Sequence, residues 1–494
     1  MLTEELVKWR NLARERAVEY GLDFYEVIYE VVSDHEMNEL ASLGGFPQRY
    51  PHWRFGMEYD RLSKSYAYGL SKIYEMVINT DPCYAYLMSS NSLLEQKLVM
   101  AHVYGHADFF KNNVYFSHTN RRMLDQMANH GVRIRKIQER YGVEPVEEFI
   151  DCCLSLENLI DHHAAAIKRK RDPKAPEKDI YAATAKESPK LKAKNYMDKF
   201  INPIEYVKEQ EAKIEEQRLV EERFPDLTDR DVLGYLLQNA QLNPWQQEVL
   251  SIIRDEAYYF APQAQTKIMN EGWASYWHTK IMTKHLLTDA EVIDYACVHS
   301  GTVATQPGSL NPYKLGLELF RNIEERWDKG QYGRDWEECD DYIAKARWDK
   351  KTGKGRDKIF EVRKLYNDIT FIDTFMTEDF CREHKMFTFA FNDRSGQHEI
   401  QSREFSQVKQ QLLTSLTNFG QPLIEVVDSN FENRGELLLR HTFDGRELKL
   451  DMADLTLINL AKVWGRPVNI ATAVEGKPIL ITCNGEEVKS KPLS

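Results

Sequence analysis

Apolar residues recur at steps of three and four through most of the first 386 residues, which is the period of amphipathic helices. The first such stretch covers residues 2–21, and Thr3 is suited to cap its N-terminus. Residues 51–81 are rich in Tyr and show no clean period. The further stretches with a helical period are 23–43, 92–110, 120–141, 146–167, 203–222, 229–240, 243–260, 263–285, 318–327 and 360–367. The pattern therefore predicts a large, mainly helical region.

The pattern changes near Phe387, where short apolar runs bounded by turn residues become common. Asp444-Gly445 is a good hairpin signal between the runs on either side of it. The predicted strands are 387–391, 423–428, 435–442 and 478–482, and the predicted helices between them are 406–417 and 455–464. We expect a mainly α protein, with a large helical domain over residues 1–386 and a small α+β domain over residues 387–494 that serves for interaction.

Residues 168–194 differ from the helical stretches around them, because they are basic, contain three Pro and have few large apolar side chains. Such a composition is typical of an exposed loop inserted in a domain. A basic patch for an acidic partner is the alternative.

The chain of 494 residues carries a formal net charge of −12, which argues against binding to nucleic acid outside such a patch. No run approaches the roughly 18 apolar residues that a membrane span needs, and the N-terminus lacks the apolar core of a signal peptide. The seven Cys include no CxxC pair and are expected to be reduced thiols. We therefore expect a cytoplasmic protein without a membrane span.

His102 and His106 form the strongest local signal for chemistry. Two His four residues apart on a helix project from one face and can chelate one ion. Ala101, Gly105 and Ala107 are small, which leaves room for another helix or a ligand to approach. The alternative is a pair of helix histidines that are hydrogen-bonded to buried polar groups.

Glu271 and Gly272 form the second signal, within the run MNEGWASYWH. Gly costs about 1 kcal/mol in a helix interior, so Gly272 suggests that something approaches closely. Glu271 could supply the oxygen ligand that the two histidines lack, or it could pair with an Arg or a His in the core. His278 lies two turns further, too far to share the ion comfortably, and is expected to bind substrate or to contact a ligand from outside.

Several weaker candidates complete the set. Tyr104 and Tyr276 could donate hydrogen bonds to a developing oxyanion if a carbonyl were the substrate. Glu95 is on the face of His102 and could orient its ring. The loop 299–313, rich in Gly, Ser, Pro and Asn, is of a kind that often lines sites. A second ligand set, or else only a polar stripe, is formed by Glu157, Asp161, His162 and His163.

The two main motifs together resemble the gluzincin class of zinc metallopeptidases, in which HExxH supplies two His and a downstream NEGxA run supplies a Glu. His102, His106 and Glu271 match those positions, so the resemblance implies zinc in a zincin-like helical domain. Val103 stands where the general-base Glu would be, and Glu271 follows His106 by far more residues than is typical. A water at the ion would therefore lack its usual proton acceptor.

Three longer runs resemble the stage V sporulation protein R (SpoVR) family. They are LMSSNSLLEQKLVMAHVYGHADFFKNN, MNEGWASYWH and HSGTVATQPGSLNPYKLG. The resemblance extends from the N-terminus to at least Asn367. It implies a cytoplasmic bacterial protein linked to the spore cortex or to stress, with a PrkA-type serine protein kinase and a von Willebrand-type domain protein as partners. The resemblance does not imply a particular chemical reaction.

Two hypotheses follow. The first is a metal-dependent hydrolase, with zinc held by His102, His106 and Glu271, that acts on a peptide or amide bond. The second is a non-enzymatic regulatory scaffold of the kinase complex, which the Val at position 103 favours. The first hypothesis requires that two helices far apart in the sequence meet.

Overall fold

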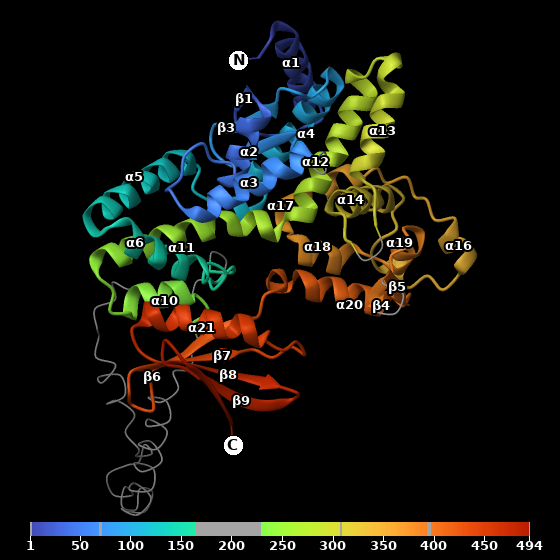
Figure 1. Ribbon diagram of the computed structural model, residues 1–494. Coiled ribbons are helices and arrows are strands. Elements are labelled where there is room, and N and C mark those ends of the chain that lie inside the picture. Colours follow the sequence, from blue (N-terminus) through green and yellow to red (C-terminus); the bar gives the residue numbers. More distant parts are fainter. Residues whose placement is uncertain (1, 69–71, 165–228, 307–308, 393–396, 494) are drawn as a thin grey trace, which may run out of the picture. The chain divides into compact units, whose positions relative to one another are not determined.

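The chain divides into two units, each of which is discontinuous in the sequence (Figure 1). The computed structural model describes residues 2–68, 72–164, 229–306, 309–392 and 397–493. The first unit comprises Met1–Glu147 and Tyr258–Gln421, and the second comprises Glu148–Ala257 and Pro422–Ser494. The sequence-based boundary at residue 387 lies inside the first unit. The basic segment 168–194 and the helix predicted at 203–222 lie outside the described residues.

The first unit contains a three-stranded sheet that the hydrophobic pattern did not predict. Its strand order is β1-β3-β2, in which β1 runs parallel to β3 and β2 antiparallel to it. The elements of this part are α1 (Glu4–Glu19), β1 (Val27–Val32), α2 (Asp34–Ser42), α3 (Trp53–Ala67), β2 (Glu75–Ile78) and β3 (Cys83–Met88). The helix predicted over residues 23–43 is wrong in its first half, because the β-branched run VIYEVV forms β1. Thr3 caps α1 as predicted.

Three helices form the centre of the first unit. They are α4 (Leu93–Asn112), α12 (Lys267–Ile281) and α14 (Pro312–Asp328). α12 packs against both α4 and α14. All but a few residues of α4 are buried, which is the behaviour of a helix that is surrounded by other elements. Ser92 and Glu95 close its N-terminus as a capping box.

The close packing of these helices depends on small residues. A Cβ atom at Gly105 would lie 2.6 Å from the Cα of Ala274, and one at Gly272 would lie 2.4 Å from the Cα of Gly316. Both distances are shorter than any side chain tolerates, so only Gly fits. The expectation that the small residues beside the histidines and at Gly272 mark a close approach is confirmed.

The remaining elements of the first unit are mostly short helices. Among them, α5, η2, α17 and α20 overlap stretches that the periodicity predicted as helical, whereas α13, α15, α16, α18 and α19 were not predicted. Residues 299–302, expected to begin a loop, are the last turn of α13. The strand β5, which pairs antiparallel with β4, was not predicted. These elements are η1 (Val114–Phe116), α5 (Met123–Tyr141), η2 (Met282–Leu286), η3 (Asp289–Glu291), α13 (Val292–Thr302), α15 (Arg334–Glu337), α16 (Tyr342–Ala346), α17 (Gly355–Leu365), α18 (Asp368–Phe375), α19 (Glu378–Glu383), β4 (Thr388–Asn392), β5 (Gln397–Ser402), α20 (Phe405–Leu416) and η4 (Thr417–Gly420).

The second unit is built on a five-stranded sheet of order β10-β9-β8-β7-β6. Its strands are β6 (Ile424–Phe431), β7 (Glu436–His441), β8 (Val468–Val474), β9 (Lys477–Cys483) and β10 (Val488–Pro492). α21 (Leu450–Trp464) packs on this sheet, and α10 (Val232–Asn239) also belongs to the unit (Figure 1). The helices α6 (Val143–Leu154) and α11 (Pro244–Gln265) begin in one unit and end in the other.

The hairpin predicted at Asp444-Gly445 is wrong. β7 pairs with β8 in parallel, and a parallel pair needs a crossover connection, which α21 supplies. The chain after Gly445 therefore enters a helix at Leu450 instead of a returning strand. Among the described residues, no helix combines the length and the apolar character that crossing a bilayer requires.

Candidate metal centre

His102 and His106 lie one turn apart on α4 and face the same way. Their rings have centroids 4.5 Å apart and are almost perpendicular, at 89°. Both side chains are buried, with 4% and 6% of the residue surface exposed. Buried imidazoles that converge in this way need partners for their ring nitrogens, since an unpaired polar atom in the interior is costly.

Glu271 of α12 is brought to this pair. Its Oε2 atom is 3.5 Å from Nε2 of His102 and 3.5 Å from Nε2 of His106. The two helices, distant in the sequence, therefore meet, and the three predicted ligands share one point. Within the described part of the chain, Oε2 of Glu271 is buried and accepts no hydrogen bond of good geometry.

Glu75 adds a second carboxylate that sequence reasoning missed. Its Oε1 atom lies 3.9 Å from Nε2 of His102. Glu75, His102 and His106 each offer one ligand atom within 4.8 Å of the others, and they form the one metal-capable cluster of His, Cys, Asp and Glu found in the described residues. Glu75 begins β2 in the stretch without a clean period, so no local signal marked it.

Hydrogen bonds on the far side of each ring fix which nitrogen faces the carboxylates. Nδ1 of His106 is 2.9 Å from Oδ1 of Asn270, and because an amide oxygen only accepts, Nδ1 carries the proton. Nδ1 of His102 is 2.9 Å from Nδ1 of His278, which is 2% exposed. The Nε2 atoms therefore face Glu271, and His278 contacts a candidate ligand from behind.

The charges around these rings leave the cluster short of positive charge. Burial, assisted by the neighbouring His102, lowers the pKa of His106 to about 4. Burial also opposes protonation of His102, but Glu271 and Glu75 outweigh it and raise the pKa of that ring. Burial raises the pKa of Glu75, with a smaller contribution from Glu271. Two carboxyl groups thus face rings of which one resists protonation, and a cation would complete the set.

Tyr313 lies beside the cluster at the start of α14. Its ring stacks on that of His102, with centroids 6.2 Å apart and an angle of 24°. Burial, followed by the negative charges of Glu271 and Glu75, raises the pKa of the Tyr313 hydroxyl, which stays protonated and can donate a hydrogen bond. Tyr313 ends the loop that the sequence had singled out, although it was not singled out itself.

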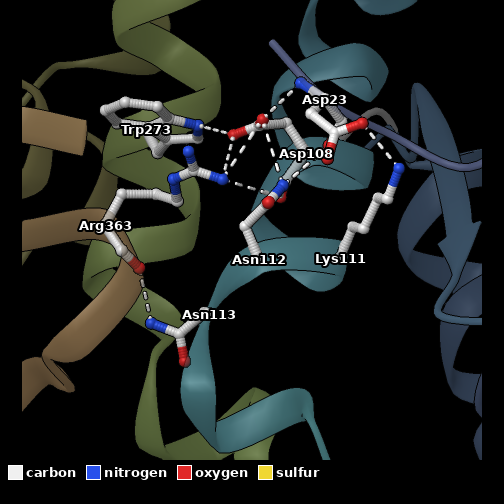
Figure 2. A network of polar contacts seen from close by, with 7 residues as sticks. All are labelled: Asp23, Asp108, Lys111, Asn112, Asn113, Trp273 and Arg363. Atoms are coloured by element: carbon white, nitrogen blue, oxygen red, sulfur yellow. Dashed lines mark hydrogen bonds and ion pairs between the residues drawn. The ribbon is translucent and has the colours of Figure 1, made fainter. Parts of the chain in front are cut away.

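Asp108 holds α4 and α12 in register (Figure 2). Its carboxylate accepts hydrogen bonds from Nε1 of Trp273 at 2.7 Å and from the backbone N–H of Asp23 at 2.8 Å, and it pairs with Arg363 at 3.2 Å. Asp108 follows His106 by two residues, and Trp273 follows Glu271 by two residues. The hydrogen bond between them therefore fixes the positions of the candidate ligands relative to each other.

Asp368 fixes the beginning of α12. Its two carboxylate oxygens accept the backbone N–H groups of Ile268 and Met269 at 2.8 and 2.9 Å. These groups belong to the first turn of the helix, where no intrahelical acceptor is present. Burial raises the pKa of Asp368 to about 7.

The structure places the other predicted residues elsewhere. The hydroxyl of Tyr104 donates to the carbonyl oxygen of Arg10 at 3.5 Å, and its ring packs on Phe24. The hydroxyl of Tyr276 contacts the ammonium group of Lys280. Neither tyrosine is brought to the histidine pair.

The structure also shows the surroundings of Glu95, of Asp161 and of Val103, which occupies the general-base position. Glu95 caps α4 and pairs with Lys72 at 3.1 Å instead of orienting a ring. Asp161 accepts the backbone N–H of His163 within a turn. Val103 is fully buried in the hydrophobic core, so no proton acceptor occupies the position next to His102 on α4.

Comparison with known proteins gives a family for the chain. Residues 1–421 match the family model described as SpoVR like protein, and residues 422–475 match the one described as SpoVR-like C-terminal domain. The junction between the two matches coincides with the end of the first unit at Gln421. The uncharacterized protein YcgB of Escherichia coli (strain K12) is 30% identical over 482 residues, which cover 90% of this chain and 87% of that protein. No solved structure matches.

Proposed function

This chain belongs to the SpoVR family, and we propose that it is a metal-dependent hydrolase that acts on a peptide or amide bond. In this proposal His102, His106 and Glu271 hold zinc, and Glu75 lies beside them. The observation that carries the proposal is the buried Glu271 oxygen, 3.5 Å from both Nε2 atoms, while the opposite nitrogens are held by Asn270 and His278.

The donor set and its spacing fit zinc. Two imidazole nitrogens and one carboxylate oxygen form a common ligand set of catalytic zinc sites, with a fourth position left for water or substrate. Ligand atoms at about 2.0–2.1 Å from a tetrahedral ion lie about 3.4 Å from each other. The separation of 3.5 Å between Oε2 of Glu271 and each ring nitrogen agrees with that value.

Each residue of the cluster then has a defined task. A bound zinc ion would supply a Lewis acid that polarises a carbonyl and lowers the pKa of water. Asn270 and His278 hold the two rings with Nε2 directed inward. Val103 cannot accept a proton, so we assign that role to the Glu75 carboxylate, 3.9 Å from His102. The Tyr313 hydroxyl is suited to donate to an oxyanion.

Metal content of the purified full chain tests the site directly. We expect close to one zinc per chain by inductively coupled plasma mass spectrometry, and no zinc in His106→Ala or Glu271→Ala. His118, which is exposed and outside the cluster, provides the matched control: His118→Ala should retain the metal. Metal-free wild-type protein that also fails to take up added zinc would refute the site.

Activity requires a separate test. Peptides and muropeptide precursors would be screened for cleavage that stops on chelation and returns with zinc. Because Glu75 is assigned to the proton and not to tight binding, Glu75→Gln should keep most of the metal and lose turnover. Full turnover in Glu75→Gln would remove that assignment while leaving the metal site intact.

One observation favours a second candidate function. Because Val103 removes the usual general base, the site could hold an ion only for structure, and the chain would then be a regulatory scaffold for a PrkA-type serine protein kinase and a von Willebrand-type domain protein. Co-purification of those proteins with wild-type chain and with His106→Ala separates the candidates. Equal recovery of the partners with both, in the absence of any hydrolysis, would favour the scaffold.

A further inference from the structure

A cavity of about 720 Å³ lies in the first unit, apart from the metal cluster. It is enclosed by the residues that precede α14, the first turns of α14, the end of α19, the strands β4 and β5, and α20. Its lining does not include His102, His106 or Glu271. The volume is within the range of about 300–1,000 Å³ that is usual for small-molecule sites.

The walls of the cavity are mainly apolar and aromatic. They include Leu315, Phe380, Phe387, Phe389, Val408 and Leu412. Leu310 and Ile400, which also line it, are 41% and 43% exposed, so apolar surface continues to the opening. Exposed apolar surface that is continuous with a cavity is typical of a site for an apolar ligand.

The charged groups of the cavity are predominantly basic. Lys314 and Lys385 line it, and neither makes an ion pair with any residue that the structure describes. The carboxylate in the lining, that of Glu318, is already paired with Arg321 at 2.9 Å. The unbalanced charge of the cavity is therefore positive, although the chain as a whole carries −12.

The backbone at Lys385 adopts a conformation that is uncommon for a lysine. Lys385 has a φ of +52°, in the left-handed region that favours Gly and disfavours residues with a Cβ. It follows His384, the C-cap residue of α19, and Gly is the usual residue at this position. Replacing Lys385 by Gly would therefore remove the side chain without adding strain to the backbone.

We propose that this cavity binds a single-chain amphiphile with an anionic head group, the chemistry that free fatty acids and lysophosphatidic acid share. The chain of the ligand would lie against the phenylalanines and Leu412, and its head group would lie at Lys314 and Lys385. This site is independent of the proposed hydrolase and stands whether or not zinc is bound.

Binding to the full chain would be measured by displacement of a fluorescent fatty acid. The competitors are palmitate, lysophosphatidic acid, a neutral alkyl maltoside and an alkyl trimethylammonium salt of equal chain length. We expect the two anionic amphiphiles to bind at least tenfold more tightly than the others. The order of the affinities of palmitate and lysophosphatidic acid identifies which head group the site prefers. Equal binding of all four would overturn the proposal, because an apolar groove without a charged group does not distinguish head groups by their charge.

Variants locate the site. Leu412→Trp should fill the cavity and abolish displacement, and Lys385→Gly should weaken anion binding about tenfold while it relieves the backbone. Lys351 is the matched control, since it is an exposed lysine with a φ of +47° that does not line the cavity. Lys351→Gly should relieve its backbone equally and leave binding unchanged. Unchanged binding in Leu412→Trp, or weakening in both glycine variants, would refute the assignment.

Discussion

Two buried polar clusters join α4 to α12, and they differ in how well their polar atoms are satisfied. The Asp108 carboxylate is fully buried and receives donors on both oxygens, from Trp273, Asp23 and Arg363 (Figure 2). The Glu271 carboxylate, a few residues along the same pair of helices, faces two ring nitrogens at 3.5 Å and accepts no good hydrogen bond from any described residue.

The difference shows what distinguishes a structural polar cluster from a candidate binding site. Both clusters connect the same elements. The Asp108 side chain is fully buried, and the Glu271 side chain is 18% exposed. The first cluster is complete within the protein and holds the helices together. In the second, two carboxyl groups face two ring nitrogens and Oε2 of Glu271 accepts no hydrogen bond of good geometry, which is an arrangement that a cation completes.

The largest expected effect is on folding and separates the clusters directly. Asp108→Asn leaves the buried Arg363 guanidinium without its counter-charge, which should lower the free energy of unfolding by about 3–5 kcal/mol. Glu271→Gln, measured without metal, should change it by less than about 1 kcal/mol, because Gln keeps the shape of Glu and Oε2 of Glu271 accepts no hydrogen bond of good geometry. Chemical denaturation of the two variants with chelator present is the measurement. Equal losses would mean that both clusters are structural.

Metal should stabilise the protein through the second cluster alone. At a free zinc concentration of 100 times the dissociation constant, the wild-type chain should gain about 2.7 kcal/mol of unfolding free energy. His106→Ala should gain nothing at the same concentration. Denaturation with and without zinc checks this, and a gain of similar size in His106→Ala would place the ion elsewhere.

Asn270 and His278, which contact Nδ1 of His106 and of His102, should adjust the affinity for zinc although they are not ligands themselves. Asn270→Ala and His278→Ala should each weaken zinc binding about 10–100-fold, equivalent to about 1.4–2.7 kcal/mol. Competition with a chelator gives the affinities. His278→Gln, which can still accept a hydrogen bond from His102, should recover part of the loss, and Thr283→Ala, whose hydroxyl bonds only to its own helix, serves as the control. If none of these variants changes the zinc affinity, the hydrogen bonds to the rings do not contribute to metal binding.

The spacing of the helices should affect both stability and zinc affinity. Gly105→Ala forces a methyl group into the backbone of Ala274, which should cost about 1–3 kcal/mol of stability and also lower zinc affinity as α12 moves away. Gly56→Ala, in a helix where nothing lies within 4 Å of the new methyl group, should instead add up to about 1 kcal/mol. Thermal and chemical denaturation measure whether each substitution lowers or raises the stability. If Gly105→Ala changes neither the stability nor the zinc affinity, the backbone of Ala274 moves enough to accommodate the methyl group.

Local pattern predicted the parts of the site that lie on long helices. The four-residue step of His102 and His106, and the Gly beside Glu271, are visible in the sequence because helical spacing decides which residues share a face. The close approach at Gly105 and Gly272 followed from the same reasoning. These inferences needed only the periodicity of one helix at a time.

The remaining parts depend on contacts between distant segments. Glu75 reaches the site through β2, a strand of four residues that is placed by its pairing with β3 and not by its own pattern. The role of Asp108 could not be predicted from its own helix, because its partners Trp273, Asp23 and Arg363 come from three other segments. The hairpin at Asp444 failed for the same reason, since the partner of β7 is a strand beyond the next helix.

The discontinuity of the first unit has a consequence for how the protein is made. His106 and Glu271 are separated by 271 − 106 = 165 residues, and much of the second unit lies between them in the sequence. At about 5–20 residues per second, a ribosome takes about 8–33 s to pass from one to the other. During that interval the nascent chain carries Glu75 and both imidazoles but lacks Glu271. Ligation by Glu271 therefore follows synthesis of the later segment, and a chain interrupted between the two would carry Glu75, His102 and His106 without Glu271.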